Sequence, residues 1–236
     1  MKKEDPFARY SRQIFIEEIG LEGQRKIINA KVLIIGAGGL GSPVIQYLAA
    51  AGVGTLGIAD FDEVELHNLN RQIIHTESSV GQPKVKNAER FVSELNHQVK
   101  CVGINRKIDY SNAEEIISGF DIIVDGSDNF ATRYLVNDTC VTLRKPLVYG
   151  SILGFEGQIA VFNCNGSRNL RNIFPEPPSE DHIPDCDSLG VLGPLPGMVG
   201  SMMADLVLKI ITGLPLPLNK MILIDTFKWQ FHGIDF

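Results

Sequence analysis

The sequence predicts an α/β fold: a doubly wound, mostly parallel sheet with helices on both faces and an antiparallel extension near the C-terminus. Three observations support this prediction. The first half of the chain alternates short apolar runs with amphipathic stretches, which is the order of βαβ units. A glycine-rich turn joins the first apolar run to the stretch that follows it. Residues 157–163 alternate polar and apolar side chains, which is typical of an antiparallel strand.

The apolar runs have the length of strands, and the stretches between them have the amphipathic character of helices. We expect strands at residues 31–36, 55–60, 99–104, 121–126, 146–150, 157–163 and 222–225. We expect helices at residues 42–51, 84–96, 112–118, 130–143 and 197–212. The segment from Asn163 to Leu192 is the longest irregular stretch, and loops of this length in compact domains are usually functional or disordered.

Length and composition bound the class of protein. The 236 residues, 44% of them hydrophobic, predict one domain over residues 1–236. The longest apolar stretches are of strand length or are broken by glycine and proline, so we expect no membrane span and a cytoplasmic protein. The net charge of -6 argues against nucleic acid as a partner. The four cysteines lack CxxC spacing, which fits reduced thiols.

The glycine-rich turn predicts a phosphate-binding site. Gly36, Gly38, Gly39 and Gly41 follow the first expected strand and open a helix, so backbone N–H groups can face phosphate oxygens without an intervening Cβ. Asp60 ends the next expected strand, where a carboxylate can accept hydrogen bonds from ribose hydroxyls. These residues indicate a Rossmann-like nucleotide site. Taken alone, they are also compatible with an NAD-dependent oxidoreductase.

Two cations after this aspartate favour a triphosphate over a dinucleotide. Arg71 can form bidentate contacts to phosphate oxygens. Lys84 stands at an expected helix start, where a positive charge is unfavourable unless an anion lies beside it. The alternative for each residue is a solvated surface charge.

Asp128 is the candidate magnesium ligand. It follows a buried strand at the edge of the sheet where ligands bind in open α/β folds. One carboxylate, together with water and ATP phosphates, is a usual way to hold Mg²⁺. The alternative is that Asp128 caps the helix expected to begin near Phe130.

The motifs, in their order along nearly the whole chain, resemble the ThiF/MoeB/HesA family, the bacterial relatives of ubiquitin-activating enzymes. The motifs are RYSRQ from Arg9, GAGGLGSP, DFDEVELHNLNRQ, GQPK, DGSDN, PLVYGSILGFEGQ, FPEPP and CDSLGVLGPLPG. The resemblance implies that the chain binds ATP and Mg²⁺. With the glycine turn, the nucleotide-binding set is then Gly36, Gly38, Gly39, Gly41, Asp60, Asp62, Asn68, Arg71, Gln72, Lys84, Asp128 and Asn129.

The resemblance also implies an activity and partners. The reaction is adenylation of the C-terminal glycine carboxylate of a small ubiquitin-like sulfur carrier, for thiamine (thiazole) or molybdopterin biosynthesis. Residues 30–150 would form the ATP-binding half and residues 151–236 the carrier-binding half. Arg12 is similar to an arginine that reaches the triphosphate from the partner protomer, which implies a homodimer. The carrier would end in Gly-Gly, and a cysteine desulfurase or a sulfurtransferase is a further possible partner.

Cys186 matches the loop cysteine of the family that accepts the activated acyl group or sulfur. Asp185 and Asp187 flank it, and nearby negative charge disfavours the thiolate. The glycine-rich segments 150–157 and 193–200 are candidates to admit the carrier's Gly-Gly tail, and the alternative is that these glycines form turns.

The sequence departs from the family at its structural zinc site. Many relatives carry one CxxC before FPEPP and a second near the C-terminus, whereas Asn169 and Asn172 stand at the first pair here. Neutral amides are poor zinc ligands, so we expect no structural zinc. A non-catalytic scaffold that binds a ubiquitin-like carrier therefore stays open as an alternative, beside the oxidoreductase.

Overall fold

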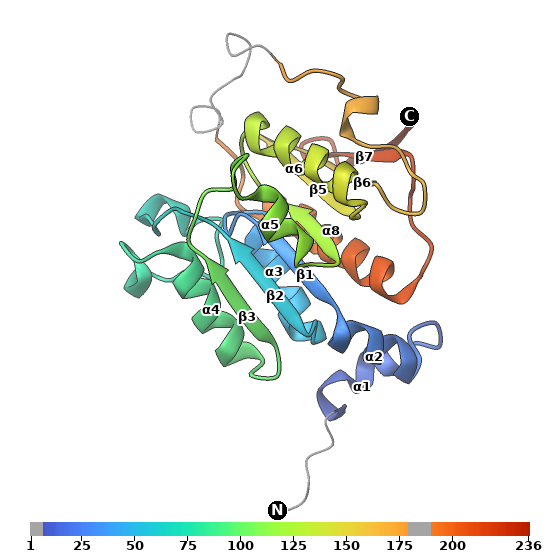
Figure 1. The fold of residues 1–236 in the computed structure, drawn as a ribbon. Coiled ribbons are helices and arrows are strands. Elements are labelled where there is room, and N and C mark those ends of the chain that lie inside the picture. The colour runs from blue at the N-terminus through green and yellow to red at the C-terminus, as the bar shows by residue number, and fades with distance from the viewer. Residues whose placement is uncertain (1–6, 179–189) are drawn as a thin grey trace, which may run out of the picture.

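A computed structural model describes residues 7–178 and 190–236. Within them, eight strands form one sheet in the order β3-β2-β1-β4-β5-β6-β7-β8 (Figure 1). The first five are parallel to their neighbours, and β6, β7 and β8 continue the sheet antiparallel. Their bounds are β1 Lys31–Ile35, β2 Thr55–Ala59, β3 Lys100–Ile104, β4 Ile122–Asp125, β5 Leu147–Leu153, β6 Glu156–Phe162, β7 Lys220–Asp225 and β8 Gln230–Asp235. The predicted fold class is confirmed.

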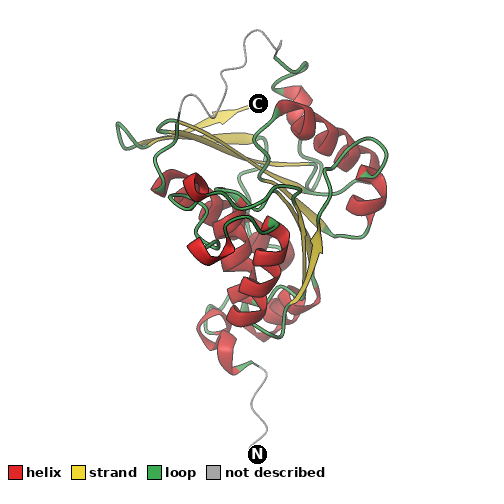
Figure 2. Ribbon diagram, turned by 90° about the vertical axis from the view of Figure 1, so that its left-hand side faces the viewer, coloured by secondary structure: helices red, strands yellow, loops and turns green. Residues whose placement is uncertain are grey.

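Helices lie on both sides of the sheet (Figure 2). One face is covered by α2 (Gly20–Asn29), α3 (Gly41–Ala51), α4 (Lys84–Leu95) and α8 (Pro194–Thr212). The other face is covered by α5 (Ala113–Ser118) and α6 (Phe130–Leu143). Short elements complete the described chain: α1 (Ser11–Ile14) and the 3-10 turns η1 (Ala8–Tyr10), η2 (Leu66–Asn68), η3 (Glu77–Ser79) and η4 (Leu170–Asn172).

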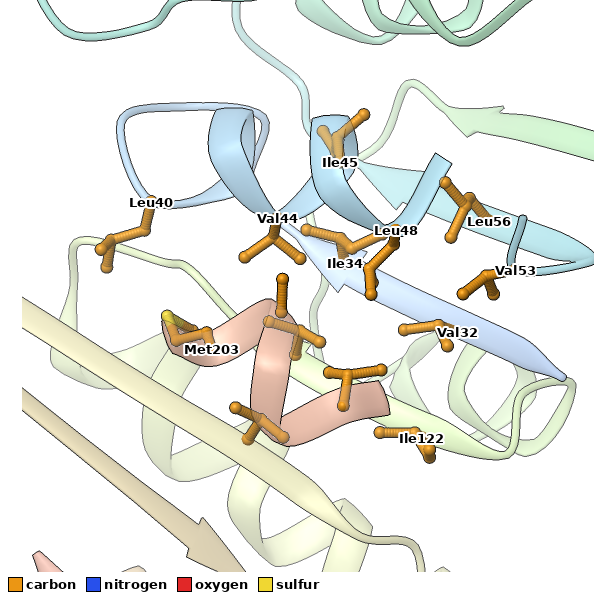
Figure 3. Close-up of a cluster of buried hydrophobic side chains, with 14 of the residues drawn as sticks. Val32, Ile34, Leu40, Val44, Ile45, Leu48, Val53, Leu56, Ile122 and Met203 are labelled. Carbon is orange, nitrogen blue, oxygen red and sulfur yellow. The ribbon is translucent and has the colours of Figure 1, made fainter. Parts of the chain in front are cut away.

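The central strands are buried on both faces, which explains their continuous apolar runs. On β1, Val32 and Ile34 point into the core beneath α3 and α8, while Leu33 and Ile35 point into the core beneath α5 and α6. All four side chains are at most 3% exposed. Figure 3 shows the first core, where residues of β1, α3 and α8 meet. Each such side chain contributes about 1.5–3 kcal/mol by its burial.

Helix α8 is the longest apolar helix of the described chain. It is 19 residues long with a mean hydropathy of 1.4, so by length and composition alone it is apolar enough to cross a membrane. Pro196, Gly197 and Gly200 interrupt its apolar run, as expected from the sequence, and they lie within one continuous helix. The helix begins at Pro194, where proline is favoured because the first turn needs no N–H donor. In the structure it packs on β5, β6 and α3, with Val199 and Met203 fully buried.

Three glycines of the segments 150–157 and 193–200 allow this packing. A Cβ at Gly150 would collide with the sulfur of Met203, and one at Gly157 would lie 2.7 Å from Val199. A Cβ at Gly200 would collide with Pro43. These glycines therefore bring α8 close to β5, β6 and α3.

Hydrogen bonds from Asn169, Arg171 and Asn172 hold the described part of the irregular segment. Asn169 and Asn172 form a reciprocal capping box around η4. Arg171 forms two 2.8 Å hydrogen bonds to the carboxylate of Asp138 on α6, and its guanidinium lies 4.8 Å from the ring centre of Tyr134. Asparagine side chains at both positions thus form hydrogen bonds with local backbone groups.

Candidate nucleotide-binding site

The candidate site is a cleft of about 380 Å³ at the carboxyl ends of β1 and β4. These strands are neighbours in the sheet, and the strand order reverses between them. Such a switch point is where open α/β sheets bind ligands. Gly36 follows β1 with φ +92°, and a Cβ there would lie 2.8 Å from the carbonyl oxygen of Gly126, which follows β4. Glycine is therefore required where the two strand ends approach each other.

Most residues predicted to bind nucleotide line this one cleft, although they come from separate loops. They are Gly36, Gly38, Gly39, Asp60, Asp62, Arg71, Gln72, Lys84, Asp128 and Asn129.

Three predicted site residues, Gly41, Asn68 and Arg12, do not line the cleft in the described structure, and the position of a fourth is not described. Gly41 packs against the backbone, since a Cβ there would collide with the carbonyl oxygen of Gly36. Asn68 is 5% exposed and forms the capping box of η2 with Glu65. Arg12 is exposed on α1. Cys186 lies outside the described residues.

The glycine turn presents free N–H groups to the cleft. The Gly36 N–H donates to the carbonyl of Ala59 at 2.8 Å, and the Ala37 N–H donates to Asp60 at 2.7 Å. The N–H groups of Gly38 and Gly39 have no hydrogen-bond acceptor among the residues that the structure describes. Free backbone donors before a helix start form an anion site, because the helix dipole adds to them.

Asp60 ties this turn to the loop after β2. One carboxylate oxygen accepts the Ala37 N–H and the other accepts the Asp62 N–H at 2.8 Å. Burial raises the pKa of Asp60, and the positive charge of Lys84 opposes that rise. Each carboxylate oxygen keeps a second lone pair, so the predicted role toward a ribose hydroxyl remains chemically available.

Lys84 is a buried cation at the floor of the cleft. Its side chain is 8% exposed, and its Nζ lies 2.8 Å from Asp62. The solvated-charge alternative is therefore wrong for Lys84. Lys84 is also the first residue of α4, where the helix dipole opposes its charge, so an anionic ligand would stabilise it further. Arg71 is half-buried, and its guanidinium donates to the carbonyl of His67 at 3.0 Å.

Asp128 stands free at the mouth of the cleft because its neighbour caps the helix. Asn129 accepts the Thr132 N–H at 2.9 Å as the N-cap of α6, so the capping alternative for Asp128 is wrong. Asp128 is exposed and accepts a 3.3 Å contact from the Asn129 amide. Within the described residues, no group of three or more acidic, histidine or cysteine side chains could hold a metal ion. One carboxylate fits Mg²⁺ only if phosphates and water supply the other ligands.

Three further cations line the cleft and were missed from the sequence. Arg106 and Lys107 follow β3, and Arg133 lies on α6. Arg133 is 7% exposed and donates to the Ser127 carbonyl at 3.0 Å and to the Ser151 hydroxyl at 2.8 Å. Nothing in the sequence indicated this burial, because an arginine in a helix is normally solvated. The contact that buries Arg133 is with Ser151 of β5, which is distant in sequence.

A second cavity of about 410 Å³ adjoins the cleft. The two share Phe130, Arg133, Ser151, Ile152 and Leu153 as lining residues. The rest of the lining comes from α6, β5, β6, η4 and the segment after η4: Tyr134, Tyr149, Glu156, Gln158, Leu170, Phe174, Glu176 and Pro178. The cavity therefore extends the cleft toward the antiparallel part of the sheet.

The described cysteines are poor nucleophiles. Burial raises the pKa of Cys101 and of Cys140 to about 12, and burial also raises the pKa of Cys164. A thiol with a raised pKa carries little thiolate at neutral pH. None of these three side chains lines the cleft.

The ThiF family profile matches residues 10–235. The chain belongs to the ThiF family. Among curated ThiF-type relatives, the chain is 50% identical over 206 residues to "Adenylyltransferase and sulfurtransferase MOCS3" of Aedes aegypti, covering 87% of this chain and 47% of the relative. It is 48% identical over 231 residues to "Adenylyltransferase and sulfurtransferase MOCS3-1" of Zea mays, covering 98% and 49%. The chain thus spans about half the length of these relatives.

A solved structure has the same fold. The crystal structure of E. coli MccB with ATP superposes with a TM-score of 0.84 at 25% identity, covering 97% of this chain and 71% of that chain. A ThiF-family Rossmann-like fold and a cleft at its switch point are therefore established for this chain.

Proposed function

We propose that this chain adenylates the C-terminal glycine carboxylate of a small ubiquitin-like sulfur carrier, using ATP. The observation that carries the proposal is the buried Lys84, which faces the same cleft as the free N–H groups of Gly38 and Gly39. A cation and oriented donors together suit a chain of phosphates. The names of the relatives support the reaction class, since they pair an adenylyltransferase with a sulfurtransferase.

The reaction needs no side-chain nucleophile. A carboxylate oxygen of the carrier attacks the α-phosphorus of ATP, an acyl-adenylate bond forms, and the bond from the α-phosphorus to its bridging oxygen breaks. Pyrophosphate leaves with the electron pair, and no proton is transferred. Lys84 and Arg71 would stabilise negative charge on the phosphates, and Asp60 would orient the ribose. Holding both reactants in line supplies much of the rate.

Magnesium fits this site as a partner of ATP. Asp128 would hold the ion through its free carboxylate, and the bound ion would neutralise charge on the phosphates. Asp62 already pairs with Lys84 at 2.8 Å, so it limits the positive charge in the cleft before nucleotide binds.

The carrier would approach through the antiparallel half of the sheet. The second cavity connects to the cleft at Ser151 and Leu153, so it is the candidate path for an extended C-terminal tail. Strand β8 is an edge strand beside exposed aromatic side chains, of which Trp229 is 71% exposed. Such an edge suits strand addition by a β-rich carrier.

We propose four further properties of this protein. Cys186 would accept the acyl group or sulfur from the carrier, with a cysteine desulfurase or sulfurtransferase as a further partner. The enzyme would be a cytoplasmic homodimer in which Arg12 reaches the partner's ATP. Residues 1–236 would form one domain, without structural zinc. Thiamine and molybdopterin carriers are both candidate substrates.

Carrier-dependent exchange of ³²P between pyrophosphate and ATP tests the proposal. The matched variants are Lys84→Met and Lys86→Met, because Lys86 lies two residues further on the same helix but is exposed and pairs with Glu89 at 2.9 Å. We expect Lys84→Met to lose at least about tenfold in exchange, since hydrogen bonds to charged groups contribute about 1.5–3 kcal/mol. Lys86→Met should keep the wild-type rate.

The same assay separates the alternatives. It is run over a panel of Gly-Gly-ended carriers, including those for thiamine and molybdopterin synthesis. ATP binding with no exchange for any carrier would favour the non-catalytic scaffold. Binding of NAD in preference to ATP would favour the oxidoreductase. Equal exchange by both lysine variants would contradict the assignment of Lys84.

A further inference from the structure

His75 is a buried histidine that contacts the glycine turn from outside the cleft. It lies in the loop between β2 and α4 and is 5% exposed. Its Nε2 lies 2.9 Å from the carbonyl oxygen of Ala37. Ala37 is the residue between Gly36 and Gly38, and it is fully buried. His75 does not itself line the nucleotide cleft.

The hydrogen-bond network fixes the protonation of this ring. A carbonyl oxygen only accepts, so Nε2 must carry a hydrogen and donate it to Ala37. On the other side, the Asn87 amide nitrogen lies 2.7 Å from Nδ1 and 2.9 Å from the carbonyl of Ile74. The amide nitrogen of Asn87 must face the Ile74 carbonyl, because the amide oxygen accepts a hydrogen bond from Arg90. The amide nitrogen therefore donates to Nδ1, which carries no hydrogen. The ring is therefore neutral, with its hydrogen on Nε2.

This contact completes the fixing of the turn. The Ala37 N–H is held by Asp60, and the Ala37 carbonyl is held by His75. In a trans peptide, the C=O and the following N–H point in opposite directions, so His75 sets the direction of the Gly38 N–H. Ser42 donates to the Gly38 carbonyl at 2.9 Å and sets the Gly39 N–H in the same way. The N–H groups of Gly38 and Gly39 both lack an acceptor among the residues that the structure describes.

We propose that His75 is a positioning residue for nucleotide: its Nε2–H orients the Ala37–Gly38 peptide so that the Gly38 N–H points at a phosphate or ribose oxygen. The inference rests on the proposed ATP site. It assigns His75 to binding, so loss of its donor raises the dissociation constant for ATP and leaves turnover at saturating ATP almost unchanged.

Protonation of His75 would break this arrangement. A hydrogen on Nδ1 would face the donating amide of Asn87, which cannot accept it. Lys84 of α4 acts on the charge of the ring directly, while Arg90 of α4 bonds to Asn87 and Asp60, which follows β2, bonds to Ala37, so both charged groups contact partners of the ring. Burial lowers the pKa of His75 below 6.5, the Ala37 carbonyl opposes this, and Lys84 lowers it further. The ring is thus neutral at pH 7, and ATP affinity should weaken as the pH falls through the lowered pKa of His75.

The test compares three variants by calorimetric titration with ATP. His75→Gln keeps an N–H donor near the position of Nε2 and cannot titrate, His75→Phe removes the donor, and His97→Gln changes an exposed histidine as a control. We expect His75→Phe to raise the dissociation constant on the order of tenfold, and His75→Gln to stay within about threefold of wild type, because one buried hydrogen bond is at stake. His75→Gln should also lose the acid-side weakening that wild type and His97→Gln show.

Nitrogen NMR of the wild-type histidine rings is the second measurement, and it does not depend on any variant folding. A neutral ring with hydrogen on Nε2 is the expected result for His75. Hydrogen on Nδ1, or equal ATP affinity for His75→Phe and wild type, would overturn the inference. If wild type binds no ATP at all, the proposed nucleotide site fails as well. If wild type binds ATP and His75→Phe binds it equally, only the role of His75 fails.

Discussion

The glycines of the nucleotide turn have two different physical roles. Gly38 lies in the cleft with ordinary backbone angles, and a Cβ there would lie 3.6 Å from Gln72 in normal van der Waals contact. Gly41 lies outside the cleft, and a Cβ there would collide with the Gly36 carbonyl. The sequence shows four glycines of one motif, but only the structure separates those that leave room for ligand from those that allow the backbone to fold.

Two alanine substitutions test this division. Gly38→Ala should keep the free energy of unfolding or raise it by up to about 1 kcal/mol, because alanine restricts the unfolded chain. It should still weaken ATP binding, since the methyl group projects into the cleft. Gly41→Ala should lower the free energy of unfolding by about 3 kcal/mol or more, because the Gly36 backbone cannot move away from the added methyl group. Urea denaturation measures the free energy of unfolding of both variants, and titration with ATP measures their affinity. A Gly41→Ala variant as stable as wild type would contradict the packing argument.

At the scale of single elements, η4 and the segment after it depend on α6. Arg171 bonds to Asp138, and the Tyr134 hydroxyl donates to the carbonyls of Phe174 and Glu176 at 3.0 and 2.8 Å. The hydrogen bonds from Arg171 are the largest cause that lowers the pKa of Asp138. This pair therefore contributes stability in full above about pH 4, near the ordinary value of 3.8, and loses it as the pH falls through the lowered pKa.

Replacement of Arg171 should loosen this segment without unfolding the sheet. We expect Arg171→Met to increase amide hydrogen exchange and proteolytic cleavage in residues 169–178, because the charge-assisted contact to Asp138 is lost. Arg168→Met is the matched control, since Arg168 is exposed and its hydrogen bonds in the described structure, to Asn219 and from Asn163, involve only its backbone N–H and carbonyl groups. The difference between the variants should shrink as the pH falls through the lowered pKa of Asp138, because the carboxylate becomes protonated there. Equal exchange at pH 7 would contradict the role of Arg171.

The sequence predicted most elements because the buried strands are short, continuous apolar runs and the helices between them are amphipathic. The parallel strands and the helices α3 to α6 begin and end within a few residues of the predicted limits. Strand β8 was missed, since all of its residues are exposed at the sheet edge and leave no apolar alternation. In the site, the glycine turn, Asp60 and Lys84 were predicted because each belongs to a local motif. Arg133 and His75 were missed because their partners are distant in sequence.

At the scale of the whole molecule, Arg12 stands apart from the cleft. It is exposed on α1, and no hydrogen bond or ion pair to it exists among the described residues. Exposed apolar residues surround it on the same segment, with Phe15 at 75% and Ile16 at 47%. A partner protomer covering this surface would bury apolar area and carry Arg12 to a second cleft.

Complementation tests the shared site. When Arg12→Ala chains are mixed with Lys84→Ala chains, heterodimers would contain one cleft with both residues intact. We expect exchange activity to recover to about a quarter of wild type at equal mixing, because random pairing makes half of the dimers mixed and each has one working site. Subunit exchange is verified by mass spectrometry with an isotope-labelled chain. Full subunit exchange with no recovered activity would contradict the shared site.

The late position of α8 in the sequence has a consequence for biosynthesis. The core side of β1 and α3 is closed by α8, whose residues leave the ribosome long after α3. Until then the nascent sheet exposes Val32, Ile34 and Val44 to solvent, and the unpaired helix is itself apolar enough to associate with other surfaces. Folding through such a long-range contact is slow and prone to aggregation. Yield of folded protein should therefore depend on chaperones that shield this face during translation.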